Sequence, residues 1–165
     1  MKQKFTVLFD LDGTLVDTAP DLIRAHNHVM KKFGYPTKTL GELKNPDGKG
    51  EKAMMEKSNG QWKWFDEKIQ NEMTDEFLSY YGSNILHESK LINGVKEFLD
   101  WCKKENISMA VCTNKQERLA IDLLKKLDLH KYFEYVAGSD TFAFNKPDPR
   151  HLTDVVEIIG GDLDK

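Results

Sequence analysis

Two periodicities of apolar residues alternate along this 165-residue chain. Short continuous apolar runs, typical of strands buried on both faces of a parallel sheet, occupy 5–9, 107–112 and 132–137. Apolar residues spaced three or four apart, typical of amphipathic helices, occupy 19–33, 62–80, 95–105, 119–127 and 149–159. Because strands and helices alternate beyond residue 84, the pattern predicts an α/β fold whose parallel strands are joined by right-handed helical crossovers.

The stretch 17–83 interrupts this alternation, since it contains helical patterns and no strand pattern. Its first helix is expected to begin after a cap at Asp17 or Thr18 and to end at Gly34. His26 lies on or beside the apolar stripe of that helix, where we expect a packed histidine. The chain therefore divides into an α/β core, residues 1–16 and 84–165, and an inserted helical subdomain, residues 17–83.

A polar turn at 45–50, inside the inserted segment, allows three interpretations. Asn45, Asp47 and Glu56 faintly follow the spacing of a calcium loop, but Lys49 stands at a ligand position. A second interpretation places Gly48–Gly50 over the mouth of the sheet, in contact with a substrate. We favour the third, a solvated loop.

The charge balance narrows the classes of partner. A net charge of −3 with 31% charged residues gives no basic field, which argues against nucleic acid or an anionic membrane as the main partner. No apolar run approaches the roughly 20 residues that span a bilayer, and the N-terminus lacks the apolar segment of a signal peptide. Cys102 and Cys112 lie in apolar patterns and are too few for a disulfide framework. We expect a cytoplasmic protein whose two thiols are small buried hydrophobes.

Polar side chains follow the predicted strands where each one ends. Asp10 and Asp12 come after the first, Thr113 and Asn114 after the second, and Lys146 after the third. The carboxyl ends of parallel strands meet at one edge of a sheet, so these groups are expected to lie together. Two neighbouring carboxylates repel, which a shared proton or a divalent cation would relieve. A carboxylate nucleophile beside a carboxylic acid, with donors and an ammonium nearby, suits phosphoryl transfer through an aspartyl-phosphate.

Three segments resemble the first three motifs of the haloacid dehalogenase superfamily: Asp10–Thr18, Val111–Asn114 and Lys146–Pro147. The helical insertion after the first motif resembles the small α-helical cap of that superfamily. The closest subgroup is the phosphoglycolate phosphatases. The resemblance implies a Rossmann-like parallel-sheet core with an inserted cap.

The resemblance also implies roles for the two acids. Asp10 would attack phosphorus as the nucleophile, and Asp12 would protonate the leaving alkoxide and then activate the hydrolytic water. Mg²⁺ would bind the side chain of Asp10 and the backbone carbonyl of Asp12. An aspartate at position 12 argues for a phosphatase, because a dehalogenase has no leaving alkoxide to protonate.

The phosphate-binding residues follow from the same resemblance. Thr113 would hold the transferring phosphoryl group with Asn114 beside it, and Lys146 would bridge the phosphate and Asp10. Gly13 and Thr14 would also bind the substrate's phosphate.

The superfamily's fourth motif, an acidic segment that completes the Mg²⁺ site, is not found. Gly160–Lys165 resembles the loop that leads to it, and Asp162 and Asp164 follow a helix end with no strand before them. We therefore expect a truncated core with an open sheet edge. The helix at 149–159 would lose part of its apolar partner surface, and Mg²⁺ binding and activity would be impaired.

The sequence thus predicts a Mg²⁺-dependent phosphatase for a small phosphorylated metabolite, with 2-phosphoglycolate as the first choice. Two other interpretations stay open: a sugar-phosphate mutase or nucleotidase with the same core, and a catalytically silent binding module. Arg24 and Arg118 are expected to be surface charges. His28, His87, His130 and His151 show no metal-ligand spacing and are expected to be structural or solvated.

Overall fold

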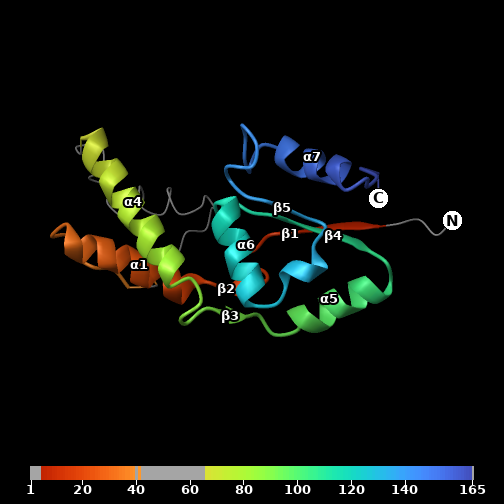
Figure 1. The fold of residues 1–165 in the computed structure, drawn as a ribbon, viewed down its shortest axis with the longest axis horizontal. Coiled ribbons are helices and arrows are strands. Elements are labelled where there is room, and N and C mark those ends of the chain that lie inside the picture. The colour runs from red at the N-terminus through yellow and green to blue at the C-terminus, as the bar shows by residue number, and fades with distance from the viewer. Residues whose placement is uncertain (1–4, 40, 42–65, 165) are drawn as a thin grey trace. The chain divides into compact units, whose positions relative to one another are not determined.

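A computed structural model describes residues 5–39, 41 and 66–164 of the chain (Figure 1). It contains two compact units, one formed by Thr18–Ser89 and the other by Met1–Asp17 with Lys90–Lys165. The chain returns from the inserted unit to the core after Ser89, whereas the sequence pattern placed this boundary after residue 83. The reason is that the segment before Ser89 is hydrogen-bonded to the first turn of the helix that follows Thr18. The turn at 45–50 and residues 62–65 lie outside the described residues.

A three-stranded parallel sheet forms the centre of the unit made by Met1–Asp17 and Lys90–Lys165. Its strand order is β1 (Thr6–Phe9), β4 (Ser108–Cys112) and β5 (Tyr135–Ala137), with Phe9 paired to Val111 and Cys112 to Ala137. All of β4 is buried, which matches its uninterrupted apolar sequence. The register brings the carboxyl ends of β1 and β4 to the same end of the sheet.

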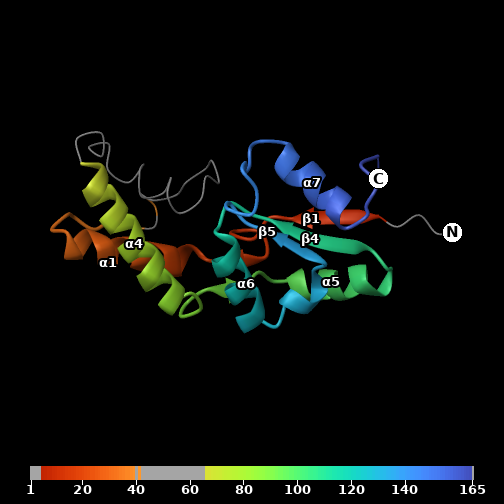
Figure 2. The same cartoon turned by 45° about the horizontal axis from the view of Figure 1, so that its top comes forward.

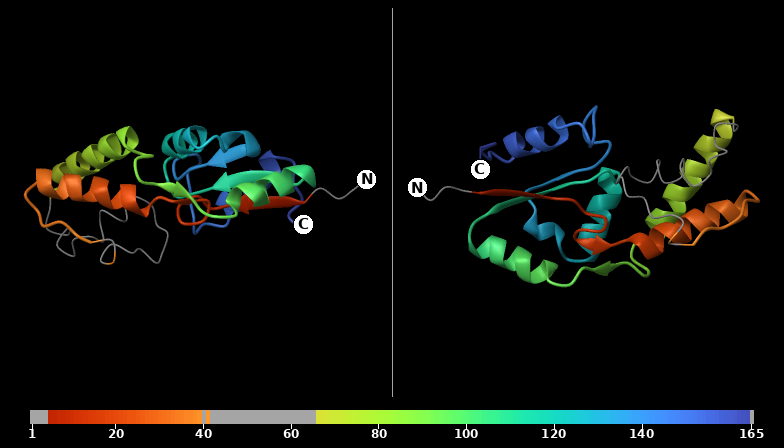
Figure 3. Two further views of the ribbon diagram at one scale, coloured as in Figure 1. Left: turned by 90° about the horizontal axis from the view of Figure 1, so that it is seen from below. Right: turned by 180° about the vertical axis from the view of Figure 1, so that it is seen from behind.

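Helices cover both faces of this sheet (Figure 2). Helix α7 (Arg150–Ile158) lies on one face, where Val155 packs with Ala110, Cys112 and Ala137. Helices α5 (Val95–Lys104) and α6 (Glu117–Lys126) lie on the other face, as the view from behind in Figure 3 also shows. There the ring of Phe9 makes edge-on contacts with Phe98 and Phe133. The predicted layered α/β core is confirmed.

Strand β1 forms one edge of the sheet within the described residues. Thr6, Val7 and Leu8 are only half-buried, in contrast to β4. The segment after α7 packs against the side chain of Thr6, because a Cβ atom added at Gly161 would lie 2.6 Å from Thr6 Oγ1. Helix α7 buries Val155 but leaves Ile158 50% exposed.

A second, very small sheet lies next to the unit boundary. Strand β2 (Val16–Asp17) pairs antiparallel with β3 (Lys90–Leu91), and Ile92 N donates to Leu15 O at 3.1 Å. Asp17 therefore belongs to a strand, whereas the sequence pattern assigned it to the helical insertion. Two-residue strands are too short to show a period, which explains the difference.

The third predicted strand is shorter than its apolar run. Residues His130–Tyr132 form a 3₁₀ turn (η2), and β5 begins only at Tyr135. The side chain of Tyr132 is 7% exposed, so it is buried in a turn rather than in the sheet. Tyr132 and Phe133 are apolar because they are buried, although neither belongs to the strand.

The Thr18–Ser89 unit contains two helices, α1 (Ala19–Lys32) and α4 (Glu67–Ser83), which pack side by side (Figure 1). Their buried faces include the residues Ala25, His26, Val29, Met30, Met73, Phe77 and Tyr81. His26 is fully buried, as expected for a packed histidine. Helix α1 ends before Gly34, whose φ of 79° is in the left-handed region.

Both cysteines are free and buried. No helix among the described residues is long and apolar enough to cross a membrane.

Candidate active site

The turn that follows β1 is closed by its own backbone. The carbonyl of Leu11 accepts hydrogen bonds from the amides of residues 14–16 at 3.0–3.3 Å, and Gly13 N donates to the carbonyl of residue 16 at 2.8 Å. Gly13 has a φ of 76°, which strongly favours glycine. The backbone that carries Asp10 and Asp12 is therefore held in one conformation at the carboxyl end of β1.

Lys146 reaches Asp10 from the loop between β5 and α7. Its Nζ lies 3.0 Å from Oδ1 of Asp10, and the two side chains are 24% and 42% exposed. Asn114, after β4, donates from Nδ2 to the backbone carbonyl of Lys146 at 3.1 Å. Residues from all three predicted strand ends thus meet at one site.

Asp12 has a partner that the sequence analysis missed. Lys115 Nζ lies 3.0 Å from Oδ1 of Asp12, and the side chain of Lys115 is fully inaccessible. A lysine after a strand end is ordinarily a solvated residue, and its position directly after Thr113-Asn114 was the available signal.

Each carboxylate of the turn therefore has its own ammonium group: Lys146 for Asp10 and Lys115 for Asp12. From the sequence, a shared proton or a divalent cation was expected to relieve the repulsion between the two carboxylates. In the structure two lysines supply that compensation, so charge repulsion by itself does not require a metal.

Thr113 is buried and held by its neighbours. Its backbone N donates to Ala137 O at 2.9 Å, and its Oγ1 accepts from Lys115 N at 3.1 Å. A hydroxyl that accepts one hydrogen bond still carries a proton to donate. Gly13 and Thr14 lie exposed at the tip of the turn.

The thiol of Cys112 lies near the site but is not activated. Burial raises its pKa to about 11, an effect that the negative charge of Asp10 reinforces and the positive charge of Lys146 opposes. Because the thiolate is the nucleophilic form, Cys112 is inert at neutral pH.

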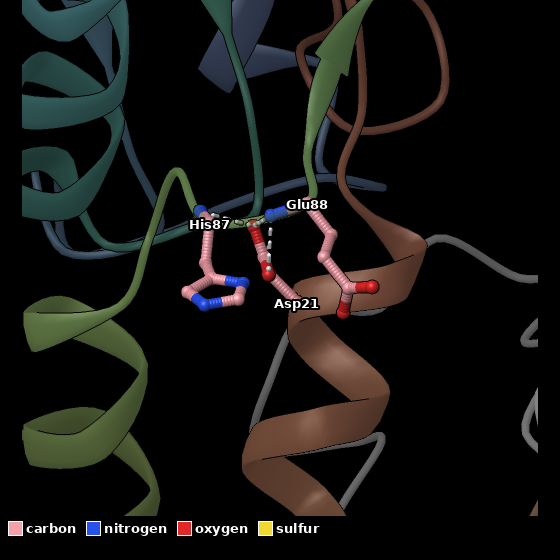
Figure 4. Close-up of side chains that lie close together, drawn as sticks. All are labelled: Asp21, His87 and Glu88. Atoms are coloured by element: carbon pink, nitrogen blue, oxygen red, sulfur yellow. Dashed lines mark hydrogen bonds between the residues drawn. The ribbon is translucent and has the colours of Figure 1, made fainter.

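A separate group of possible metal ligands lies in the Thr18–Ser89 unit: Asp21, His87 and Glu88 (Figure 4). Ligand atoms of the three lie within 4.8 Å of one another. The carboxylate of Asp21 already accepts hydrogen bonds from the backbone amides of 87–89 and pairs with Arg24. The guanidinium also donates to His87 Nδ1 at 2.6 Å and to Glu88 Oε2 at 3.0 Å. A cation already at its centre makes this group a poor metal site.

The expectation that Arg24 is an ordinary surface charge is therefore wrong. Its side chain is 24% exposed and joins α1 to the segment before β3. Burial would raise the pKa of Asp21, but hydrogen bonds from Ser89, Glu88 and His87 outweigh it and leave that pKa below the usual value.

The fold and the motif geometry define a hydrolase family. The haloacid dehalogenase-like hydrolases match residues 7–163, and the chain belongs to this family. It is 38% identical over 159 residues to a phosphoglycolate phosphatase from Agrobacterium fabrum, a match covering 96% of this chain and 68% of that protein. It is 35% identical over 161 residues to a phosphoglycolate phosphatase from Caulobacter vibrioides, covering 97% and 68%.

The solved structures give the same fold. A crystal structure of a predicted phosphoglycolate phosphatase from Haemophilus somnus superimposes with a TM-score of 0.87 at 26% identity. The match covers 98% of this chain and 74% of the other. The family and the fold class predicted from the motifs are confirmed, and the roles of the individual side chains stay predictions.

Proposed function

We propose that this protein is a Mg²⁺-dependent phosphatase that hydrolyses a small phosphorylated metabolite, 2-phosphoglycolate first among them. The observation that carries the proposal is the meeting of Asp10 and Lys146 at the carboxyl end of the parallel sheet, beside Asp12 and Thr113. The names of the relatives at 35–38% identity supply the substrate.

In the first proposed step, a carboxylate oxygen of Asp10 attacks phosphorus and forms an acyl-phosphate bond. The bond between phosphorus and the ester oxygen breaks, and Asp12 gives its proton to the departing alkoxide. Lys146 Nζ, 3.0 Å from Asp10 Oδ1, supports this step by holding the carboxylate and balancing the phosphoryl charge. The Thr113 hydroxyl and Asn114 amide would hold the phosphoryl oxygens.

In the second step Asp12, now a carboxylate, takes a proton from water while the water oxygen attacks the acyl-phosphate. Inorganic phosphate leaves and Asp10 is regenerated. The two steps use one proton on Asp12, given and then recovered, so no other reactant is needed.

The donor set of the turn fits Mg²⁺ in kind, since Asp10 is 42% exposed and its carboxylate presents the oxygen ligands that this ion prefers. Asp10 and the backbone carbonyl of Asp12 would hold the ion. When bound, it would neutralise charge on the transferred phosphoryl group.

The test is hydrolysis of an aryl phosphate and of 2-phosphoglycolate by the 165-residue chain with added Mg²⁺, compared with Asp10→Asn. We expect phosphate release by the parent chain and none by the variant. Asp122→Asn makes the same substitution at an exposed carboxylate on α6, and we expect this matched control to retain activity. Unchanged turnover in Asp10→Asn would exclude Asp10 as the nucleophile, and isomerisation without phosphate release would indicate a mutase.

A further inference from the structure

Lys115 has an unusual setting for a lysine. Among the residues that the structure describes it is the only buried lysine, with 1% of its surface exposed. Its Nζ lies 3.0 Å from Asp12 Oδ1. An ammonium group removed from water is strongly unfavourable unless it is paired, so a buried lysine indicates a geometry that the fold maintains.

The backbone of Lys115 is fixed on both sides. Its N–H donates to Thr113 Oγ1 at 3.1 Å, and its carbonyl accepts from Ser139 N at 2.9 Å. A Cβ atom added at Gly138 would lie 2.6 Å from Lys115 O, so the end of β5 packs directly on this segment. The root of the lysine side chain is therefore firmly placed.

The backbone of Asp12 is fixed as well, by the hydrogen bonds that close the turn at 11–16. The side chain of Asp12 is 29% exposed, and its contact with Lys115, which lies in the loop after β4, restricts its orientation.

We propose that Lys115 is a positioning residue that holds the carboxyl group of Asp12 toward the substrate's leaving oxygen. This inference rests on the proposed function, in which Asp12 exchanges a proton with that oxygen and then with water. Lys115 contacts Asp12 and acts through it, whereas Lys146 contacts Asp10. Proton transfer requires the donor within hydrogen-bond reach, and a displacement of about 1 Å lowers rates roughly 100-fold.

The competing explanation is a purely structural ion pair. Lys115→Met separates the two, because methionine fills similar space and the Asp12 carboxylate that loses its partner is 29% exposed and can be rehydrated. The positioning role predicts that kcat of Lys115→Met falls about tenfold or more while KM changes less than about threefold. Lys126→Met, at an exposed ion pair on α6, is the control and keeps the parent kcat.

The decisive measurement is a double-mutant cycle with Asp12→Asn on the full chain. If Lys115 acts through Asp12, adding Lys115→Met to Asp12→Asn lowers kcat by less than about twofold. Multiplicative losses, or a Lys115→Met kcat within about twofold of the parent, would overturn the proposal. If Lys115→Met does not fold, Lys115→Gln takes its place in the cycle with the same expected losses.

The same four proteins are also unfolded in urea, which reads the contact independently of turnover. We expect Asp12→Asn to change the unfolding equilibrium constant by a different factor in the presence and in the absence of Lys115. Equal factors would overturn the contact itself. A parent chain that shows this coupling but hydrolyses no phosphate ester refutes the proposed function, and the positioning role falls with it.

Discussion

Asp21→Asn gives the sharpest test of how the Thr18–Ser89 unit is held together. The side chain of Asp21 is fully buried and pairs with Arg24. Its two oxygens accept from His87 N at 3.0 Å, Glu88 N at 3.0 Å and Ser89 N at 2.8 Å. The hydroxyl of Ser89 adds a fourth donor at 2.7 Å. Figure 4 shows the carboxylate facing the amides of His87 and Glu88.

The expected loss follows from this set of contacts. Asparagine keeps the shape but removes the charge and turns one acceptor into a donor that faces other donors. Breaking a buried charged pair costs about 3–5 kcal/mol, and hydrogen bonds to a charged group are worth about 1.5–3 kcal/mol each. Because Arg24 is 24% exposed and can be rehydrated, we take the lower end, about 3 kcal/mol.

Native-state hydrogen exchange at the amides of 87–89 measures this loss locally. A change of about 3 kcal/mol corresponds to exchange faster by a factor on the order of 100. Glu88→Gln is the matched control, because its carboxylate is 56% exposed and its pair with Arg24 is worth at most about 1 kcal/mol. Exchange in Asp21→Asn that is no faster than in Glu88→Gln would refute this reasoning.

The same site predicts a pH dependence. The pKa of Asp21 is lowered in the folded protein, so its contribution is present above the ordinary value of 3.8 and is lost as pH falls through the lowered folded value. Protection of the amides of 87–89 in the parent chain should therefore decrease progressively as pH falls below about 3.8 toward the lowered folded pKa. A flat profile in that range would contradict the assignment.

Three further predictions concern stability and reactivity. Gly138→Ala should destabilise the chain by about 1–3 kcal/mol or more in urea unfolding, because its Cβ would lie 2.5 Å from Glu117 Cα; a loss below about 0.5 kcal/mol would contradict the close approach. Cys112, with a pKa of about 11, should resist iodoacetamide at pH 8 until the chain is unfolded, and rapid labelling of the native protein would show the thiol to be accessible. Phe77→Ala should cost about 3–5 kcal/mol, whereas Ile69→Ala at a 36% exposed site on the same helix should cost far less; equal losses would argue against the packing of α4.

Regular elements were predictable because their periods were long enough to detect. Strand β4 is buried throughout and almost entirely apolar, and α1 ends at Lys32, two residues before Gly34, whose φ is positive. Strands β2 and β3 were missed because two residues carry no period. The apolar run that begins at Tyr132 resembles one strand, but Tyr132 ends a 3₁₀ turn and strand β5 begins only at Tyr135. Buried residues outside a sheet are also apolar, so the sequence pattern does not separate the two.

The site shows the same division. Asp10, Thr113, Asn114 and Lys146 could be grouped in advance, because parallel topology brings strand ends to one edge. Lys115 could not be, since a charged residue is normally exposed and only the packed chain reveals its burial.

Arg24 was misjudged for the same reason. Asp21 lies three residues away on the same helix, but His87 and Glu88 are 63 and 64 residues away in the sequence. The helical pattern around Arg24 predicts its helix but carries no information on a segment more than 60 positions away.

The central claim is that Asp10 carries the phosphoryl group during hydrolysis. Its most direct measurement is peptide mass spectrometry of the chain, acid-quenched during turnover of 2-phosphoglycolate at saturating Mg²⁺. We predict one added phosphoryl group on the tryptic peptide that contains Asp10, and none in Asp10→Asn. Turnover without that modification, or the same modification in Asp10→Asn, would contradict it.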